Sequence, residues 1–99
     1  MIITVGDIFY SSWGCEQTNI DFYQVVGVTD KTVKLRKIAQ ENDWSEDRNN
    51  GGKTIPKVNE FTGEAFSRKK RDGHEFLKIS DYCYAYPWDG KPQSFTSYA

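Results

Sequence analysis

The sequence has few of the residues that build metal centres, disulfide frameworks and catalytic dyads. It contains two cysteines and one histidine, too few for a tetrahedral zinc site without carboxylates or a second chain. It shows no glycine-rich phosphate loop, no metal-ligand spacing and no nucleophile elbow. No spacing pairs the carboxylates near aromatic residues, Asp7, Glu16, Asp21 and Asp89, into an acid–base dyad. We therefore expect no catalytic residue, no metal and no cofactor.

Net charge and long apolar runs are missing as well. The formal net charge is −1, which favours neither nucleic acid nor an anionic membrane as a partner. No apolar run reaches the length of a membrane span, and residues 1–5 lack the basic start and apolar stretch of a signal peptide. We expect a cytoplasmic protein without a membrane partner, in which Cys15 and Cys83 stay reduced.

Aromatic residues, in contrast, are abundant. They make up 15% of the 99 residues, with six Tyr, six Phe and three Trp. The length fits one domain spanning 1–99, and 37% hydrophobic with 27% charged residues is typical of a folded globule. Because a core this small cannot hold every ring, we expect several Tyr and Trp side chains at the surface, where they favour interfaces.

Alternation of apolar and polar residues predicts short strands. The clearest is Ile20–Val28, whose two faces are both partly apolar, as in a central strand covered on both sides. Thr29-Asp30-Lys31 reads as a tight turn. Asp72-Gly73 between 65–71 and 74–79 is the strongest short-range hairpin signal in the chain. Further strands are expected at 2–10, 32–38, 55–61 and 82–86.

These strands predict an all-β protein: a small SH3-like barrel or a strongly bent antiparallel sheet, with an OB-like barrel as the second choice. Ile38 is out of phase with Leu35, so its burial would call for a bulge near Arg36-Lys37. The polar segment 40–54 is expected to be a mobile loop, in which 43–48 are compatible with one helical turn capped by Asp43. Residues 89–99 are expected to form a C-terminal tail without a strand.

Two segments have a more specific pattern: GDIFYSSWGCEQTNIDFYQV at 6–25 and YAYPWDGKP at 84–92. Together they cover roughly a third of the chain and resemble a group of small uncharacterised proteins encoded by bacteriophages and mobile elements. Cys15 stands where that group has an aromatic residue, which argues against an essential cysteine. The resemblance implies a phage or mobile-element origin, and hence the host cytoplasm for a phage protein. It transfers no activity and no functional residue, but favours proteins that bind and block a host factor.

An aromatic surface is the leading function hypothesis. Rings supply contact area at low entropic cost, and amides and carboxylates orient hydrogen bonds. The same polar residues are equally suited to fixing loops, and the same rings to completing the core. The hypothesis describes a non-enzymatic module that binds a host or phage protein, such as an inhibitor of host defence. Its residues are Trp13, Gln17, Asn19, Asp21, Tyr23, Trp44, Tyr84, Tyr86 and Trp88, with Tyr82 on the same strand face as Tyr84 and Tyr86.

Three other sets offer alternatives. The basic residues Lys34, Arg36, Arg68 and Lys70 would form a stripe for nucleic-acid phosphates if their strands are neighbours, or would protect a sheet edge. The acidic residues around Trp44, which are Glu41, Asp43, Glu46 and Asp47, would mimic nucleic-acid phosphates or meet a basic partner, with Trp44 as the anchor. A small-ligand or enzymatic site would form around Gln17, Asn19 and Asp21. The sequence does not choose among these, and gives neither the partner nor the oligomeric state.

Overall fold

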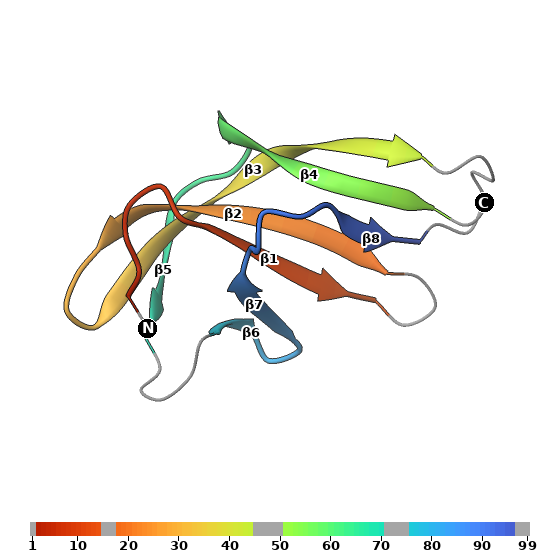
Figure 1. The fold of residues 1–99 in the computed structure, drawn as a ribbon. Coiled ribbons are helices and arrows are strands. Elements are labelled where there is room, and N and C mark those ends of the chain that lie inside the picture. The colour runs from red at the N-terminus through yellow and green to blue at the C-terminus, as the bar shows by residue number, and fades with distance from the viewer. Residues whose placement is uncertain (1, 15–17, 45–50, 71–75, 97–99) are drawn as a thin grey trace.

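The computed structural model of the chain describes residues 2–14, 18–44, 51–70 and 76–96 (Figure 1). These residues form strands and turns, which confirms the all-β prediction, and they contain no helix long and apolar enough to cross a membrane. The strands are β1 (Ile8–Trp13), β2 (Asn19–Val28), β3 (Thr32–Trp44), β4 (Gly52–Phe61), β5 (Phe66–Lys69), β6 (Leu77–Ser80), β7 (Cys83–Pro87) and β8 (Gln93–Phe95).

All the strands belong to one antiparallel sheet with the order β6-β7-β1-β2-β3-β4-β8, and β5 pairs with β3 beside this path. β3 is long enough to pair with β5 through 32–35 and with β4 through 38–44 along the same edge. Within the described part of the chain, the end strands β6 and β8 do not pair, so the sheet is not closed. The predicted barrel is therefore wrong, and the alternative of a bent antiparallel sheet is confirmed.

Each face of the sheet carries its own hydrophobic core. Phe22 of β2 points to one face and its neighbours Tyr23 and Val25 point to the other, because side chains alternate along a strand. The prediction that β2 is a central strand covered on both sides is confirmed. Core 1 lies between β1–β2–β3 and β6–β7 and consists of Ile3, Phe9, Tyr23, Val25, Val33, Leu35, Leu77 and Ala85. Core 2, on the opposite face, consists of Ile20, Phe22, Ile38 and Phe95.

This two-sided burial explains Ile38 without the predicted bulge near Arg36-Lys37. The pairing of β2 with β3 runs regularly from Phe22 opposite Ile38 to Val25 opposite Leu35. Leu35 enters core 1 and Ile38 enters core 2, so their opposite phases are both satisfied. The irregularity in this pairing lies instead between Val25 and Gly27.

Several strand bounds differ from the prediction. β1 begins only at Ile8, because Asp7 accepts hydrogen bonds from the Thr4 backbone N–H at 2.9 Å and the Thr4 hydroxyl at 3.0 Å and so holds a turn. At the other end of β1, the strand continues through Ser11 and Ser12 to Trp13, where a loop was expected.

The predicted loop at 40–54 is wrong at both ends, because β3 continues to Trp44 and β4 begins at Gly52. Asp43 and Trp44 are therefore strand residues rather than part of a helical turn, and 45–50 lie outside the described residues. The predicted tail is also wrong at 93–95, which form β8 against β4, with Phe95 buried. Thr96 then donates its N–H to the Thr18 carbonyl at 3.0 Å. This bond joins the end of β8 to the residue before β2, and Phe95 of β8 packs in core 2.

Among the described residues of 65–79, the two arms of the predicted hairpin do not pair with each other. β5 pairs with β3 and β6 pairs with β7, while the Asp72-Gly73 turn lies outside the described residues. The reason is packing: Phe66 of β5 rests edge-on against Tyr23, and Leu77 of β6 is fully buried in core 1.

A buried amide fixes an irregular part of β4. Pro56 pairs with Gln40 and Phe61 pairs with Ile38, so residues 57–60 bulge opposite Ala39. Asn59 within this bulge has a φ of 67°, in the left-handed region. The Gln24 side chain, 5% exposed, donates to Asn59 Oδ1 and accepts from the Asn59 N–H, both at 2.8 Å. Both ends of the amide are thereby satisfied in the interior.

Replacing Gln24 by Leu should destabilise the protein by about 1–3 kcal/mol, because the two hydrogen bonds that join Gln24 to Asn59 are lost and each is worth about 0.5–1.5 kcal/mol. The free energy of unfolding in urea measures the loss. Asn59→Gly is the comparison variant: it removes the Oδ1 acceptor but keeps the N–H bond to Gln24, and glycine adopts the positive φ, so it should lose less stability than Gln24→Leu. A loss below about 0.5 kcal/mol for Gln24→Leu would show that the two hydrogen bonds between Gln24 and Asn59 do not hold the bulge.

Candidate functional site

The outer side of β7 carries a row of contacting aromatic rings. Tyr86 lies opposite Tyr10 of β1, with ring centroids 6.2 Å apart. Phe76, just before β6, contacts Tyr86 at 5.7 Å and Tyr84 edge-on at 5.4 Å. These separations are those at which aromatic pairs attract. We call Tyr10, Tyr86, Phe76 and Tyr84 the aromatic row.

The two tyrosines of β7 in this row face solvent. Tyr86 is 45% exposed and Tyr84 is 36% exposed. The residues between and before them, Ala85 and Cys83, point to the other face, where Ala85 is buried in core 1 and Cys83 Sγ lies 2.7 Å from Ser11 Oγ. The alternation of small and aromatic residues in β7 therefore fills core 1 and turns the rings outward.

Trp88 and Tyr82 do not extend the aromatic row. Trp88 is half-buried, packs edge-on against Phe22 at 6.2 Å and donates its indole N–H to the Lys91 carbonyl at 2.7 Å. It covers core 2 rather than offering a free ring. Tyr82 lies in the turn between β6 and β7 and is 94% exposed, so the predicted face of three tyrosines holds only for Tyr84 and Tyr86.

Trp13 lies on the opposite face of the sheet from the aromatic row. Its indole N–H donates to Asp21 Oδ2 at 2.9 Å, and Asp21 Oδ1 forms an ion pair with Lys37 at 3.2 Å. Trp13 shares the parity of Phe9 and Ser11 in β1, whereas Tyr10 has the other parity. The two aromatic segments therefore do not form one patch, although Trp13 itself is 46% exposed.

The polar residues beside Trp13 are engaged in holding the sheet together. Both carboxylate oxygens of Asp21 have partners, and Asn19 donates its amide to the Trp13 carbonyl at 3.4 Å. Gln17 lies outside the described residues, as does the Trp44 side chain. The geometry thus offers no support for a ligand site built on Asn19 and Asp21.

Tyr23 is a core residue, which corrects its assignment to the binding surface. It is 7% exposed and packs edge-on against Phe66 with ring centroids 5.6 Å apart. Burial, together with the nearby negative charge of Asp21, raises the pKa of Tyr23 to about 12.

The basic residues do not form the predicted stripe. Arg36 donates to the Gly63 carbonyl at 2.8 Å and stacks on Phe61 at 4.4 Å. Arg68 donates twice to the Ile79 carbonyl, at 3.0 and 2.9 Å, and stacks on Phe66 at 4.7 Å. Because Arg68 pairs with Val33, it lies on the other face from Lys34. Lys70 follows β5 and is half-buried, with its N–H bonded to the Lys31 carbonyl.

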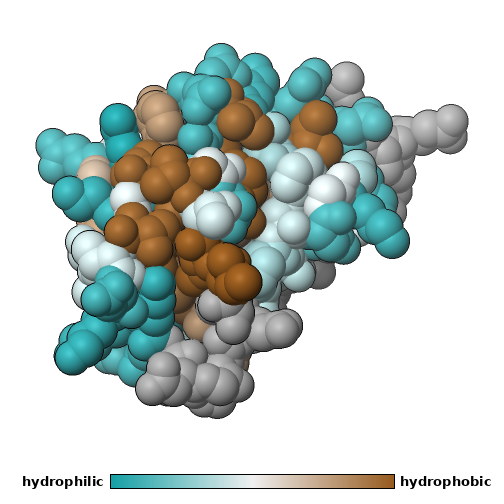
Figure 2. All heavy atoms as spheres, turned by 60° about the vertical axis from the view of Figure 1, so that its left-hand side comes forward, coloured by the Kyte–Doolittle hydropathy of each residue, from teal (hydrophilic) through white to brown (hydrophobic). Residues whose placement is uncertain are grey.

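Two further surfaces are exposed on the described part of the chain. Figure 2 shows hydrophobic atoms gathered on the side that carries the N-terminus, where Ile2 and Val5 are 90% and 66% exposed. On β3, Glu41 and Asp43 of the predicted acidic set are exposed, while Glu46 and Asp47 lie outside the described residues. Among the residues described, no three His, Cys, Asp or Glu side chains gather as they would around a metal ion.

Tyr10 and Phe76 are the members of the aromatic row that the sequence analysis missed. A signal for Phe76 exists in the alternation of its segment, because Leu77 and Ile79 pack toward core 1 and Phe76 must face the other way. Tyr10 gives no comparable signal, since its role depends on the pairing of β1 with the distant β7.

Replacing Arg68 by Lys should lower stability by about 1–2 kcal/mol, because an ammonium cannot reproduce the paired bonds to Ile79 or the stacking on Phe66. Thermal and urea unfolding measure the change. Lys34→Arg, on the opposite face and solvent-exposed, is the control and should be neutral. Equal stability of Arg68→Lys and the wild type would show that Arg68 is not needed to stabilise the fold, and would leave phosphate binding as its role.

Tyr23 should make the protein less stable in alkali. An unfolded tyrosine ionises near pH 10, whereas Tyr23 in the folded state keeps its proton to about pH 12. The contribution of protonated Tyr23 to the free energy of unfolding is therefore complete below about pH 10 and is lost as the pH rises toward 12. The control is Tyr23→Phe, which keeps the ring but cannot ionise. The difference between the unfolding midpoints of the wild type and Tyr23→Phe should stay constant near neutral pH, and the wild type should lose stability relative to the variant above about pH 10. Parallel pH profiles over the whole range would contradict the raised pKa.

In comparisons with known proteins, no protein-family model, curated protein or solved structure matches the chain.

Proposed function

We propose that this protein is a non-enzymatic binding module of phage or mobile-element origin, acting in the host cytoplasm, that engages another protein through the aromatic row. The observation that carries the proposal is the exposure of Tyr84 and Tyr86 on a strand that is anchored on its other face by Ala85, which is buried in core 1. β7 is held between β6 and β1, so the rings are presented from a paired strand and not from a loop. Pre-ordered rings lose little entropy on binding.

The charges beside the row favour a protein partner over nucleic acid. Lys78 lies opposite Tyr84, but its ammonium forms an ion pair with Asp81 at 3.4 Å. Arg36 and Arg68 are engaged with backbone carbonyls and aromatic rings on other parts of the sheet. A surface of tyrosines with neutralised flanking charge suits an apolar, uncharged patch of a partner protein.

Binding of this kind acts by occlusion. Tyr84 and Tyr86 would be buried on the partner, and their hydroxyl groups, at the outer ends of the rings, would take hydrogen bonds at the margin of the contact. A host protein covered in this way loses access to its own ligands. Inhibition of a host-defence factor is the form of this function that fits the proposed origin.

The test is affinity capture from a bacterial lysate with quantitative mass spectrometry, comparing wild type, the double variant Tyr84→Ala plus Tyr86→Ala, and Trp13→Ala. The control removes an equally exposed ring from the opposite face. We expect a partner that wild type and Trp13→Ala retain and that the double variant loses by at least about tenfold, since truncating anchor rings costs more than about 1.4 kcal/mol.

Circular dichroism and urea unfolding show whether the double variant keeps its fold. Retention of every partner by a folded double variant would refute the proposal. So would a partner whose capture collapses between low and moderate salt and is abolished by nuclease, because steep salt dependence is the property of phosphate contacts.

A further inference from the structure

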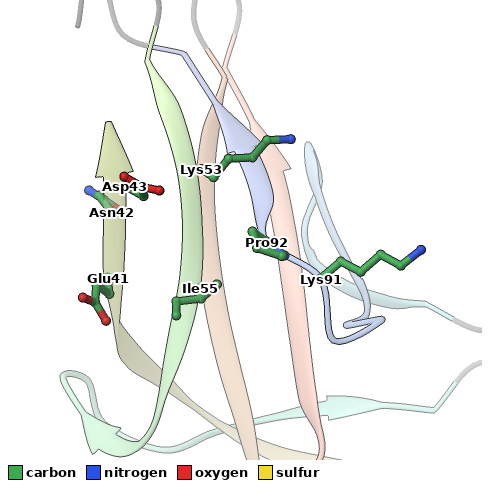
Figure 3. A pocket seen from close by; sticks show the side chains of 7 residues that line it. All are labelled: Glu41, Asn42, Asp43, Lys53, Ile55, Lys91 and Pro92. Atoms are coloured by element: carbon green, nitrogen blue, oxygen red, sulfur yellow. The ribbon is translucent and has the colours of Figure 1, made fainter. Parts of the chain in front are cut away.

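A second surface lies on the far arm of the sheet, where β3, β4 and the start of β8 run together. A hollow of about 690 Å³ is open there, and its walls include Glu41, Asp43, Lys53, Ile55, Lys91 and Pro92 (Figure 3). None of these residues belongs to the aromatic row or to either core.

Strand pairing determines which side chains meet at this surface. Asp43 lies opposite Lys53, and Glu41 lies opposite Ile55. Thr54, between Lys53 and Ile55, points to the other face, where it is buried and accepts a hydrogen bond from Gln40 at 3.0 Å. The outer face of this arm therefore carries two carboxylates on β3 and an isoleucine, 38% exposed, on β4.

The carboxylates are not neutralised by the lysine across the strand pair. The Lys53 ammonium donates to Ser94 Oγ at 2.9 Å, and Figure 3 shows the side chain extending toward β8, away from Asp43. The ion pairs found among the described residues, Lys37–Asp21 and Lys78–Asp81, involve neither Glu41 nor Asp43. One rim of the hollow is thus acidic.

The opposite rim carries the basic side chain of Lys91, whose backbone is held by hydrogen bonds. The Lys91 backbone N–H donates to Asp89 Oδ1 at 2.9 Å, and its carbonyl accepts the Trp88 indole N–H at 2.7 Å. Figure 3 shows the Lys91 side chain extending away from β3 and β4. Ile55 and Pro92 lie between the two rims.

The surface as a whole, with an acidic rim, an apolar centre and a basic rim, is complementary in charge to a second copy of itself turned by 180°. A two-fold axis through the centre places Glu41 and Asp43 of one molecule against Lys53 and Lys91 of the other, as an isologous contact requires. We propose that the occupant of this hollow is a second copy of the chain, in a symmetric and reversible dimer. The contact is small and its ion pairs are exposed, so the dimer is weak and sensitive to salt.

The test is sedimentation velocity over a concentration series on three proteins: wild type, the acid-reversed variant Glu41→Lys plus Asp43→Lys, and the lysine-reversed variant Lys53→Glu plus Lys91→Glu. We expect each variant alone to raise the dimer Kd at least about tenfold. An equimolar mixture of the two variants should associate again, because opposite rims then face each other.

Opposite net charges attract wherever they are placed, so the mixture needs a matched control. Asp30→Lys plus Glu64→Lys and Lys31→Glu plus Lys69→Glu make the same changes of charge at exposed positions away from the hollow. These variants should dimerise like wild type, and mixing them should add nothing. Equal association of the control mixture and the rim mixture would overturn the proposal.

Two further results would also overturn it. One is a wild type that stays monomeric up to about 1 mM, the concentration at which even a contact worth only about 4 kcal/mol is populated. The other is a monomeric wild type whose hollow binds an oligolysine peptide, which would make a basic segment the occupant. The Tyr84→Ala plus Tyr86→Ala variant should dimerise normally, so this inference and the proposed function fail independently.

Discussion

The structure depends on burying both faces of one strand. Phe22 and Tyr23 are neighbours in β2, and each must be covered on its own side of the sheet. In a chain of 99 residues this requires two thin cores in place of one thick core. β6 and β7 cover the first, and Phe95 of β8 with the half-buried ring of Trp88 completes the second. Aromatic side chains suit this arrangement, because each ring buries a large area.

The same constraint decides which rings stay in water. Once Ala85 has entered core 1, Tyr84 and Tyr86 have only the outer side of β7 to occupy. Phe76 and Tyr10 support them from both sides, so the exposed rings form a row and not isolated side chains. Trp13 lies three residues after Tyr10 in β1, an odd number, so its side chain points to the opposite face of the sheet from the row. The sheet itself thus divides the aromatic surface that the sequence suggested into two.

What the sequence predicted well is what depends on neighbours along the chain. The alternation of 20–28 and the turn at 29–31 define β2 and the start of β3, and the exposure of Tyr84 and Tyr86 follows from the same periodicity.

Pairing between distant segments could not be predicted from such local patterns. Asp72-Gly73 indicated a hairpin, but packing on Tyr23 joined β5 to β3 and burial of Leu77 joined β6 to β7. Residues 40–44 and 52–54 appear loop-like because their outer face is polar, and only pairing with each other and with β8 makes them strands. The site had the same limit. Tyr23 is buried because the distant Phe66 packs against it, and Arg36 and Arg68 donate to backbone carbonyls that only the folded chain brings near.

Hydroxyl-radical footprinting of the protein, free and bound to a captured partner, locates the binding surface on the folded sheet. Tyr84 and Tyr86 should react in the free protein and become protected in the complex, while Trp13, on the opposite face, should react equally in both. Protection of Trp13 with Tyr84 and Tyr86 still reactive would place the partner on the opposite face of the sheet and refute binding through the aromatic row.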